Sequence, residues 1–182
     1  MHKIIRRAFL ALFIILFILI LTLCVLRGLF PLKHYDLIEK YCEEYTVKPY
    51  FVSALIKAES NFREDAVSHA DAKGLMQLTD ATFLYCMETL GKEGDIFSAE
   101  DNIQAGVWYL SHLLKKYDGN ITNAIAAYNA GSTNVDGWLS DSRYSDDGKT
   151  LLEIPFGETD RHVGKIRRYG NIYKFLYPKT KG

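Results

Sequence analysis

Residues 58–82 read AESNFREDAVSHADAKGLMQLTDAT, and the second residue of this stretch is a glutamate at an unusual helical position. An amphipathic helix is predicted to start at Pro49, because proline suits the first helical position. Glu59 follows Leu55 and Ile56 by four and three residues, so its carboxyl group projects from the apolar side of that helix. Desolvation disfavours the charged form of a carboxyl group, which suits a general acid. A helix cap or an ion-pair partner is the alternative interpretation.

Apolar residues at helical spacing predict several further helices around this one. Residues 35–44 combine apolar positions at offsets of three and four with charged positions between them, which is typical of an amphipathic helix. Further helices are predicted at residues 75–90, 102–117, 121–128 and 159–177. Residues 131–157 are rich in Gly, Ser, Asp and Asn, so we expect a long surface loop with a short hairpin around Asp147 and Gly148. Strand signals are scarce, and the prediction is an all-α domain over residues 34–182.

The N-terminal residues 1–33 predict a membrane anchor. Nineteen uncharged residues run from Ala8 to Leu26, and about 20 apolar residues suffice for a helix to cross a bilayer. No small-residue cleavage site follows, which argues against a removed signal peptide. Basic residues flank the stretch on both sides, and their slight excess before it favours a cytoplasmic N-terminus. We therefore expect a single-pass anchor in the cell membrane, with the domain on the extracytoplasmic side. A buried core helix is the alternative interpretation.

Charge and cysteine content exclude some classes of function. The formal net charge is zero, but residues 34–182 hold 17 basic and 22 acidic side chains, and a surface of that sign lacks the basic footprint of a nucleic-acid-binding protein. Cys42 and Cys86 have neither the paired spacing of a zinc site nor a C-x-x-C motif. They form either a disulfide or two buried free thiols, and the sequence leaves both possibilities open.

Several motifs in order along the chain resemble the soluble-lytic-transglycosylase family, which shares the goose-type lysozyme fold. They span most of the chain from Tyr35 to Tyr177. The motifs are E-S-x-F at 59–62, A-x-S at 66–68, G-L-M-Q at 74–77, N-I-x-x-G-x-x-Y-L at 102–110, A-Y-N-A-G at 127–131 and a closing segment at 154–166. The resemblance implies a lysozyme-like helical domain acting on the glycan strands of peptidoglycan, without a metal or other cofactor.

The resemblance also implies roles for individual residues. Glu59 is the expected catalytic group, first as general acid and then as general base, in cleaving the MurNAc-GlcNAc bond and forming a 1,6-anhydro ring. An amide side chain both donates and accepts hydrogen bonds, so Gln77 suits the acetamido group of a sugar. The expected substrate-binding residues are Ser60, Met76, Gln77, Tyr128, Asn129 and His162. For Ser60 a helix-capping role, and for Met76 a core-filling role, remain open alternatives.

The sequence departs from the family pattern at three positions. Asp71 and Asp80 stand where glycine and proline are usual, and His162 stands where the closing motif has a tyrosine. Histidine can carry a positive charge below about pH 6.5, and such a neighbour would favour the ionised form of Glu59, so we expect an altered pH optimum. Two alternatives to a lytic transglycosylase remain, namely a lysozyme-type hydrolase on the same fold and a catalytically idle peptidoglycan-binding scaffold.

Overall fold

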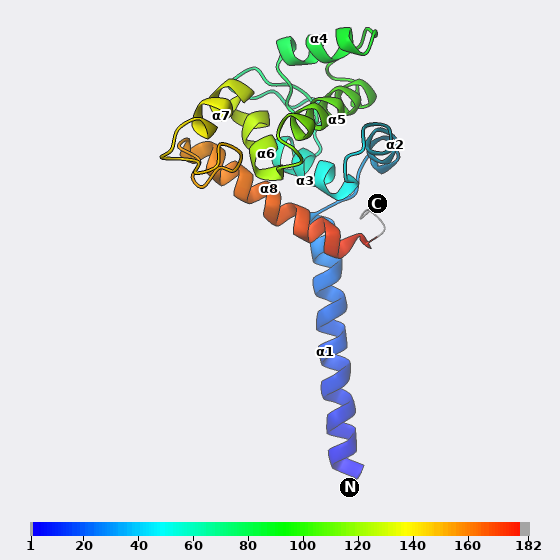
Figure 1. Ribbon diagram of the computed structural model, residues 1–182. Coiled ribbons are helices and arrows are strands. Elements are labelled where there is room, and N and C mark those ends of the chain that lie inside the picture. The colour runs from blue at the N-terminus through cyan, green and yellow to red at the C-terminus, as the bar shows by residue number, and fades with distance from the viewer. Residues whose placement is uncertain (1, 179–182) are drawn as a thin grey trace. The chain divides into compact units, whose positions relative to one another are not determined.

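A computed structural model describes residues 2–178 of the chain, which form two compact units (Figure 1). One unit ends at Leu32 and the other begins at Lys33. The first unit holds α1 (His2–Leu29). The second unit holds α2 (Tyr35–Tyr45), α3 (Pro49–Glu59), α4 (Asp80–Thr89), α5 (Ala99–Lys116), α6 (Ile121–Ala130), α7 (Ser132–Leu139) and α8 (Gly157–Leu176). The described residues contain no strand beyond isolated β-bridges, which confirms the predicted all-α class.

Helix α1 is long and apolar enough to cross a membrane. The candidate span covers Ile4–Leu29, a stretch of 26 residues, and none of its most apolar window is buried. A core helix of a soluble domain would be mostly buried, so the exposure of α1 argues against that alternative. Length and composition alone do not distinguish an anchor from a signal sequence.

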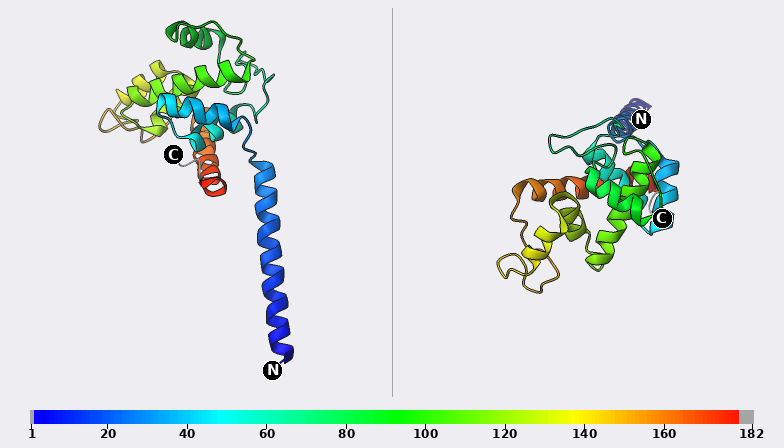
Figure 2. Two further views of the ribbon diagram at one scale, coloured as in Figure 1. Left: turned by 90° about the vertical axis from the view of Figure 1, so that its right-hand side faces the viewer. Right: turned by 90° about the horizontal axis from the view of Figure 1, so that it is seen from above.

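Helices α3 and α5 lie at the centre of the second unit. Figures 1 and 2 show α4 at one end of this unit and α8 at the other, with α3 and α5 between them. Seven of the eleven residues of α3 are buried, because the helix packs against α2 on one side and α8 on the other. Helix α5 begins where the Ser98 hydroxyl accepts a hydrogen bond from the Asp101 N–H, a normal N-cap.

The segment before α4 is a tight turn and not a helix. The prediction placed a helix start at residue 75, but α4 begins at Asp80, where Thr79 provides the N-cap. Lys73 and Leu78 exchange two backbone hydrogen bonds of 2.8 and 3.0 Å across the turn, and Gln77 has a positive φ of 50° within it. The turn buries the apolar residues Leu75, Met76 and Leu78 in the core. Helical spacing did not predict the turn.

The predicted loop at residues 131–157 is wrong in its first part. Helix α7 occupies Ser132–Leu139 and buries Val135, Trp138 and Leu139. These apolar residues recur at helical spacing, but the surrounding polar residues obscured the signal. The expected hairpin also does not form, since the Asp147 carboxylate instead accepts from the N–H groups of Lys149 and Thr150 at 2.8 and 2.7 Å.

Two cysteines of the second unit are free thiols in the interior. Cys42 lies on α2 and Cys86 on α4, and both are buried. Burial raises the pKa of each thiol to about 12. The sequence left two alternatives open, a disulfide or two buried free thiols, and the structure shows the two free thiols.

Candidate active site

Glu59 is the last residue of α3, at a point where the chain turns sharply. Its side chain is 14% exposed. Asn61 and Phe62 follow with φ values of 56° and 60°, a left-handed conformation that ends the helix. Ser60 is buried, and its hydroxyl donates to the Ile56 carbonyl at 3.2 Å. This bond within the helix end agrees with the helix-capping alternative for Ser60, and substrate binding by Ser60 stays a prediction.

Helix α8 holds the C-terminal end of α3 through two neighbouring side chains. His162 Nε2 lies 3.0 Å from Glu59 Oε1, and its side chain is 13% exposed. Lys165, almost one turn further along α8, donates from Nζ to the Ala58 carbonyl at 2.9 Å. A cation is favourable beside the carbonyl groups at a helix C-terminus. The site thus has one glutamate oxygen bound to His162, while no described residue forms a hydrogen bond with Glu59 Oε2.

Asn102 of α5 holds the turn at residues 73–78 in place. Its Oδ1 accepts from the Met76 N–H at 2.8 Å, and its Nδ2 donates to the carbonyls of Ile96 at 2.8 Å and Lys73 at 3.2 Å. Gly74 has a φ of +74°, and a Cβ there would lie 2.3 Å from Asn102 Nδ2. Glycine is therefore needed both for the backbone conformation and for the close approach. The sequence motif contained Asn102 but gave no indication of this role.

Gln77 is fixed by the same turn. Its Nε2 donates to the carbonyls of Ala66 at 3.1 Å and Gly74 at 2.9 Å. These two acceptors determine the orientation of the amide, because a carbonyl oxygen in that place would face two other carbonyl oxygens. Within residues 2–178 no group donates to Gln77 Oε1, which leaves this oxygen free to accept from the N–H of a ligand.

Tyr128 of α6 connects the turn to the neighbouring helices. Its hydroxyl donates to the Met76 carbonyl at 2.8 Å, and its ring lies 5.5 Å from the ring of Tyr109, centroid to centroid. Burial, and next the Glu59 carboxylate, raise the pKa of Tyr128 well above its usual value. The hydroxyl is therefore protonated at neutral pH, and Tyr128 lies close enough to Glu59 for a carboxylate there to disfavour ionisation of the hydroxyl.

Met76 lies in the core, as its core-filling alternative has it, and contact of Met76 with substrate stays a prediction. The side chain is fully buried. It packs so closely on α5 that a Cβ at Gly106 would lie 2.4 Å from Met76 Sδ. The core-filling alternative therefore holds for the side chain. Met76 contributes to the site through its backbone carbonyl, which receives the Tyr128 hydroxyl.

Asn129 is an exposed residue of the A-Y-N-A-G motif. Its Oδ1 accepts from the Thr159 hydroxyl of α8 at 2.8 Å, an interaction that the sequence did not predict. This bond directs the oxygen toward α8 and leaves the Nδ2 group without a hydrogen-bond partner among the described residues. Asn129 therefore presents donors, and Gln77 presents an acceptor.

Three acidic residues that lie near Glu59 in the sequence form ion pairs. Asp71 and Asp80, the two departures from the family pattern, both pair with Lys73, at 3.3 and 2.6 Å from its Nζ. Glu64 is exposed and lies 3.3 Å from His34. The described part of the chain contains no group of three or more His, Cys, Asp or Glu side chains that could hold a metal ion.

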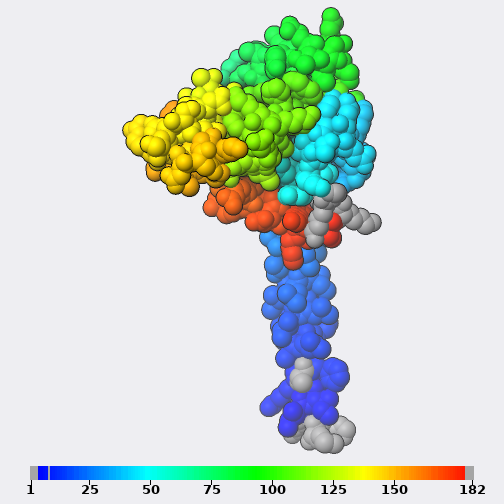
Figure 3. Space-filling view, in the orientation of Figure 1, coloured from blue at the N-terminus to red at the C-terminus, as the bar shows by residue number. Residues whose placement is uncertain are grey.

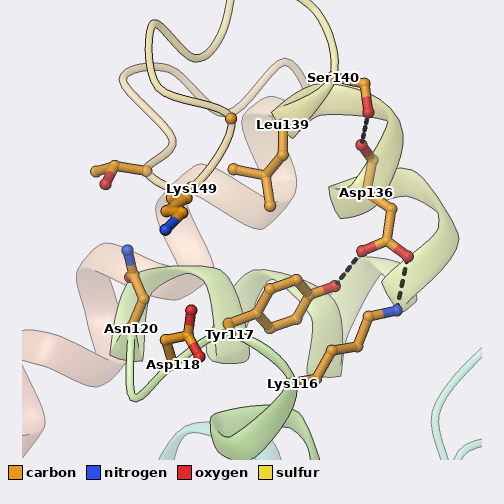
Figure 4. Close-up of a pocket in the computed structure, with 10 residues that line it drawn as sticks. Lys116, Tyr117, Asp118, Asn120, Asp136, Leu139, Ser140 and Lys149 are labelled. Carbon is orange, nitrogen blue, oxygen red and sulfur yellow. Dashed lines mark hydrogen bonds and ion pairs between the residues drawn. The ribbon is translucent and has the colours of Figure 1, made fainter.

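A cavity of about 480 Å³ lies apart from these residues. Figure 4 shows the residues that line it, near the C-terminal ends of α5 and α7. Lys116 and Tyr117 line it, both bonded to Asp136. None of the predicted site residues lines this cavity, so it does not serve as a guide to the site.

Comparisons with known proteins agree with the motifs. Residues 36–151 match the family model described as Transglycosylase SLT domain. The chain is 29% identical over 153 residues to the soluble lytic murein transglycosylase of Escherichia coli K12, covering 81% of this chain and 24% of that protein. It is 37% identical over 167 residues to membrane-bound lytic murein transglycosylase C of Yersinia pestis, covering 78% and 47%.

A solved structure is also similar. An inactive mutant of the lytic transglycosylase Slt from Pseudomonas aeruginosa aligns with a TM-score of 0.71 at 31% identity, over 80% of this chain and 24% of that one. The chain thus spans about a quarter of the length of the soluble relatives that it matches.

Proposed function

Since the chain belongs to the Transglycosylase SLT domain family, we propose that it is a peptidoglycan lytic transglycosylase with Glu59 as its catalytic group. The enzyme cleaves the β-1,4 bond between N-acetylmuramic acid and N-acetylglucosamine and leaves 1,6-anhydro ends. One observation carries the proposal. Glu59 is a largely buried carboxyl group with one oxygen held by His162 at 3.0 Å and the other without a protein partner. A general acid must lie within hydrogen-bond reach of the atom that it protonates. The Glu59 oxygen without a protein partner is available for that contact with the substrate.

The chemistry needs one carboxyl group that acts twice. Glu59 first protonates the glycosidic oxygen as the bond breaks. The resulting carboxylate then accepts the proton of the muramoyl C6 hydroxyl, which attacks the anomeric carbon and closes the anhydro ring. Most glycosidases instead use two carboxyl groups about 5 to 9.5 Å apart. The pairing of Asp71 and Asp80 with Lys73 supports a mechanism with a single carboxyl group.

Three side chains of the site suit an acetamido sugar. Gln77 Oε1 is available to accept from the amide N–H of the sugar, and Asn129 Nδ2 is available to donate to a hydroxyl or carbonyl. The part-buried ring of Tyr128 offers a flat apolar surface beside Glu59. We therefore assign glycan binding to these three residues and positioning of Glu59 to His162.

Residues 1–33 are proposed as the anchor and residues 34–182 as the catalytic domain. Helix α1 has the length and apolarity of a membrane span. One relative carries the description membrane-bound. The basic residues at the start of α1, which precede its uncharged stretch, favour a cytoplasmic N-terminus. On this proposal the chain crosses the cell membrane once, and the catalytic domain acts on the extracytoplasmic side.

Digestion of purified peptidoglycan, followed by mass spectrometry, tests the reaction. A lytic transglycosylase gives anhydro products that are lighter by one water than those of a hydrolase. We expect Glu59→Gln to lower the rate at least about 100-fold, since general acid-base catalysis contributes about that much or more, while glycan binding is retained. Glu64→Gln, a change of the same kind at an exposed position, should leave the rate unchanged.

Each other outcome has a definite meaning. Reducing ends in place of anhydro ends would assign the protein to the lysozyme-type hydrolases. An inactive parent protein that still binds glycan would assign it to the scaffolds. Equal loss of activity in the Glu59 and Glu64 variants would remove Glu59 from its catalytic role.

A further inference from the structure

The acidic and basic residues of the chain are segregated. All 22 acidic residues lie between Asp36 and Asp160, whereas residues 161–182 contain seven lysine or arginine residues and no acidic residue. Five of the seven lie on α8, and the remaining two lie beyond the described residues. The five are Arg161, Lys165, Arg167, Arg168 and Lys174. Past its first turn α8 is therefore a basic helix on an otherwise acidic domain.

One line along α8 combines this charge with an exposed aromatic ring. Arg161, Arg168 and Phe175 are separated by seven residues, which is nearly two helical turns, so they lie in a row. All three are exposed, and Phe175 is 71% exposed. The buried residues of α8, among them Val163 and Ile166, lie on the opposite side. We call the row of Arg161, Arg168 and Phe175 the outer face of α8.

The outer face is exposed, and its arginines have no ion-pair partner among the described residues. Figure 3 shows α8 at the surface of this unit, in orange to red. Neither Arg161 nor Arg168 forms an ion pair with any residue between 2 and 178. Lys165 and Lys174 differ, since the first bonds to Ala58 and the second lies over a tyrosine ring.

The combination of cations and a protruding aromatic ring restricts the class of partner. A soluble polyanion would attract the arginines but would leave Phe175 in water. An anionic bilayer surface satisfies both, because basic residues bind its headgroups while an aromatic side chain enters the boundary between headgroups and acyl chains. Only residues 30–34 join α1 to α2, and this connection spans at most about 20 Å. A membrane crossed by α1 would therefore be within reach of the domain.

From these observations we propose that the outer face of α8 docks on the anionic headgroups of the membrane, with Phe175 entering the bilayer interface. Docking would hold the catalytic domain in a defined orientation, which a five-residue tether alone does not provide. The proposal rests on membrane anchoring by α1 only for the nearness of the membrane, and it is independent of the catalytic activity. The experiment below distinguishes a failure of docking from a failure of the anchor.

The test uses the full chain with Phe175→Trp, reconstituted into vesicles that contain lipids with brominated acyl chains. One set of vesicles holds phosphatidylglycerol and phosphatidylcholine, and the other only phosphatidylcholine. Quenching of the added tryptophan is read after subtraction of the signal from the unsubstituted chain, which contributes Trp108 and Trp138. We expect quenching in the anionic vesicles, little quenching in the neutral ones, and loss of quenching near 1 M salt, where the Debye length falls to about 3 Å.

Charge variants identify the face responsible. Each arginine near an anionic surface contributes about 1 kcal/mol, so Arg161→Gln with Arg168→Gln should lower the ratio of docked to undocked domain about 30-fold. Lys115→Gln with Lys149→Gln removes two exposed charges away from α8 and is the matched control, for which no change is expected. Equal loss in both double variants would overturn the assignment to α8.

Vesicle flotation distinguishes the remaining outcomes. Chains that float with both kinds of vesicle but show no quenching in either would overturn the docking proposal and leave the anchor intact. Flotation with anionic vesicles alone, accompanied by quenching, would support docking and overturn the anchor. A chain that floats with neither would overturn both. A spectral shift of the added tryptophan with soluble polyphosphate, without quenching in vesicles, would assign the face to a soluble polyanion and overturn the proposal.

Discussion

The two fully buried asparagines provide a sensitive test of how the site is held. Asn102 on α5 makes three hydrogen bonds with the backbone around the turn at residues 73–78. Asn123 on α6 makes one side-chain bond, from Nδ2 to the Lys149 carbonyl at 2.7 Å, and its Oδ1 is buried without a partner. Changing each to alanine removes the same atoms from equally buried positions. The two variants therefore differ mainly in the number of bonds lost.

The expected destabilisation follows from that difference. A hydrogen bond contributes about 1 kcal/mol net, and a buried partner left unsatisfied costs about 1 to 3 kcal/mol. Asn102→Ala should therefore lower the free energy of unfolding by about 3 to 5 kcal/mol, a large share of the roughly 5 to 15 kcal/mol that holds a typical domain together. Asn123→Ala should lower it by about 1 kcal/mol or less, because it also removes an oxygen that is already unsatisfied.

Urea unfolding of the full chain in detergent measures both values. Trp108 and Trp138 both lie in the second unit, so their fluorescence reports its unfolding without contribution from α1. With a slope of about 2 kcal/mol per molar urea, the midpoint should fall by at least about 1.5 M for Asn102→Ala and by about 0.5 M or less for Asn123→Ala. Equal shifts in the two variants would refute the assignment of Asn102 as the residue that holds the turn.

The same pair of variants should also differ in activity. Asn102 binds the N–H of Met76, whose carbonyl receives the Tyr128 hydroxyl. Loss of Asn102 should therefore lower the rate of peptidoglycan cleavage even under conditions where the variant is fully folded. Full activity per folded molecule would mean that the turn is important for stability alone.

Three further predictions concern the end of α3 and the thiols. His162→Tyr should change the pH-rate profile, because an imidazole beside Glu59 can carry a positive charge and a phenol cannot; an unchanged profile would contradict a role for this contact. Lys165→Met should lower kcat more than it raises KM, since it removes the bond to Ala58 beside the catalytic residue, and rescue by Lys165→Arg would separate this positioning role from simple packing. Burial raises the pKa of Cys42 and Cys86 from the ordinary 9.0 to about 12. Their thiolate fraction at pH 8 is therefore about 1000-fold below that of an ordinary exposed thiol and rises tenfold per pH unit. A disulfide-exchange reagent at pH 8 should label both slowly in the folded chain and rapidly in urea, and fast labelling without urea would contradict their burial.

The helices were largely predictable from local spacing. Periodicity placed α2, α3, α5, α6 and α8 within a few residues of their observed bounds, because each buries one face and the alternation of apolar and polar residues records that burial. The same rule failed at residues 75–78, where apolar residues are buried by a turn. It also failed at α7, whose buried residues are few and lie among glycine and polar residues.

The candidate site was only partly predictable for a different physical reason. The sequence by itself located Glu59 on the apolar side of a helix and supplied the motif around it, since both depend on neighbouring residues. The pairing of Glu59 with His162 joins residues 103 positions apart. The family resemblance led us to expect this contact, while only the packing of α3 on α8 decided its distance. Ser60 and Met76 also face inward. The sequence could not show this, because the helices packed around a turn determine which of its side chains are buried. The sequence thus determined which chemical groups the protein has, and the tertiary structure decided which of them remain accessible to a substrate.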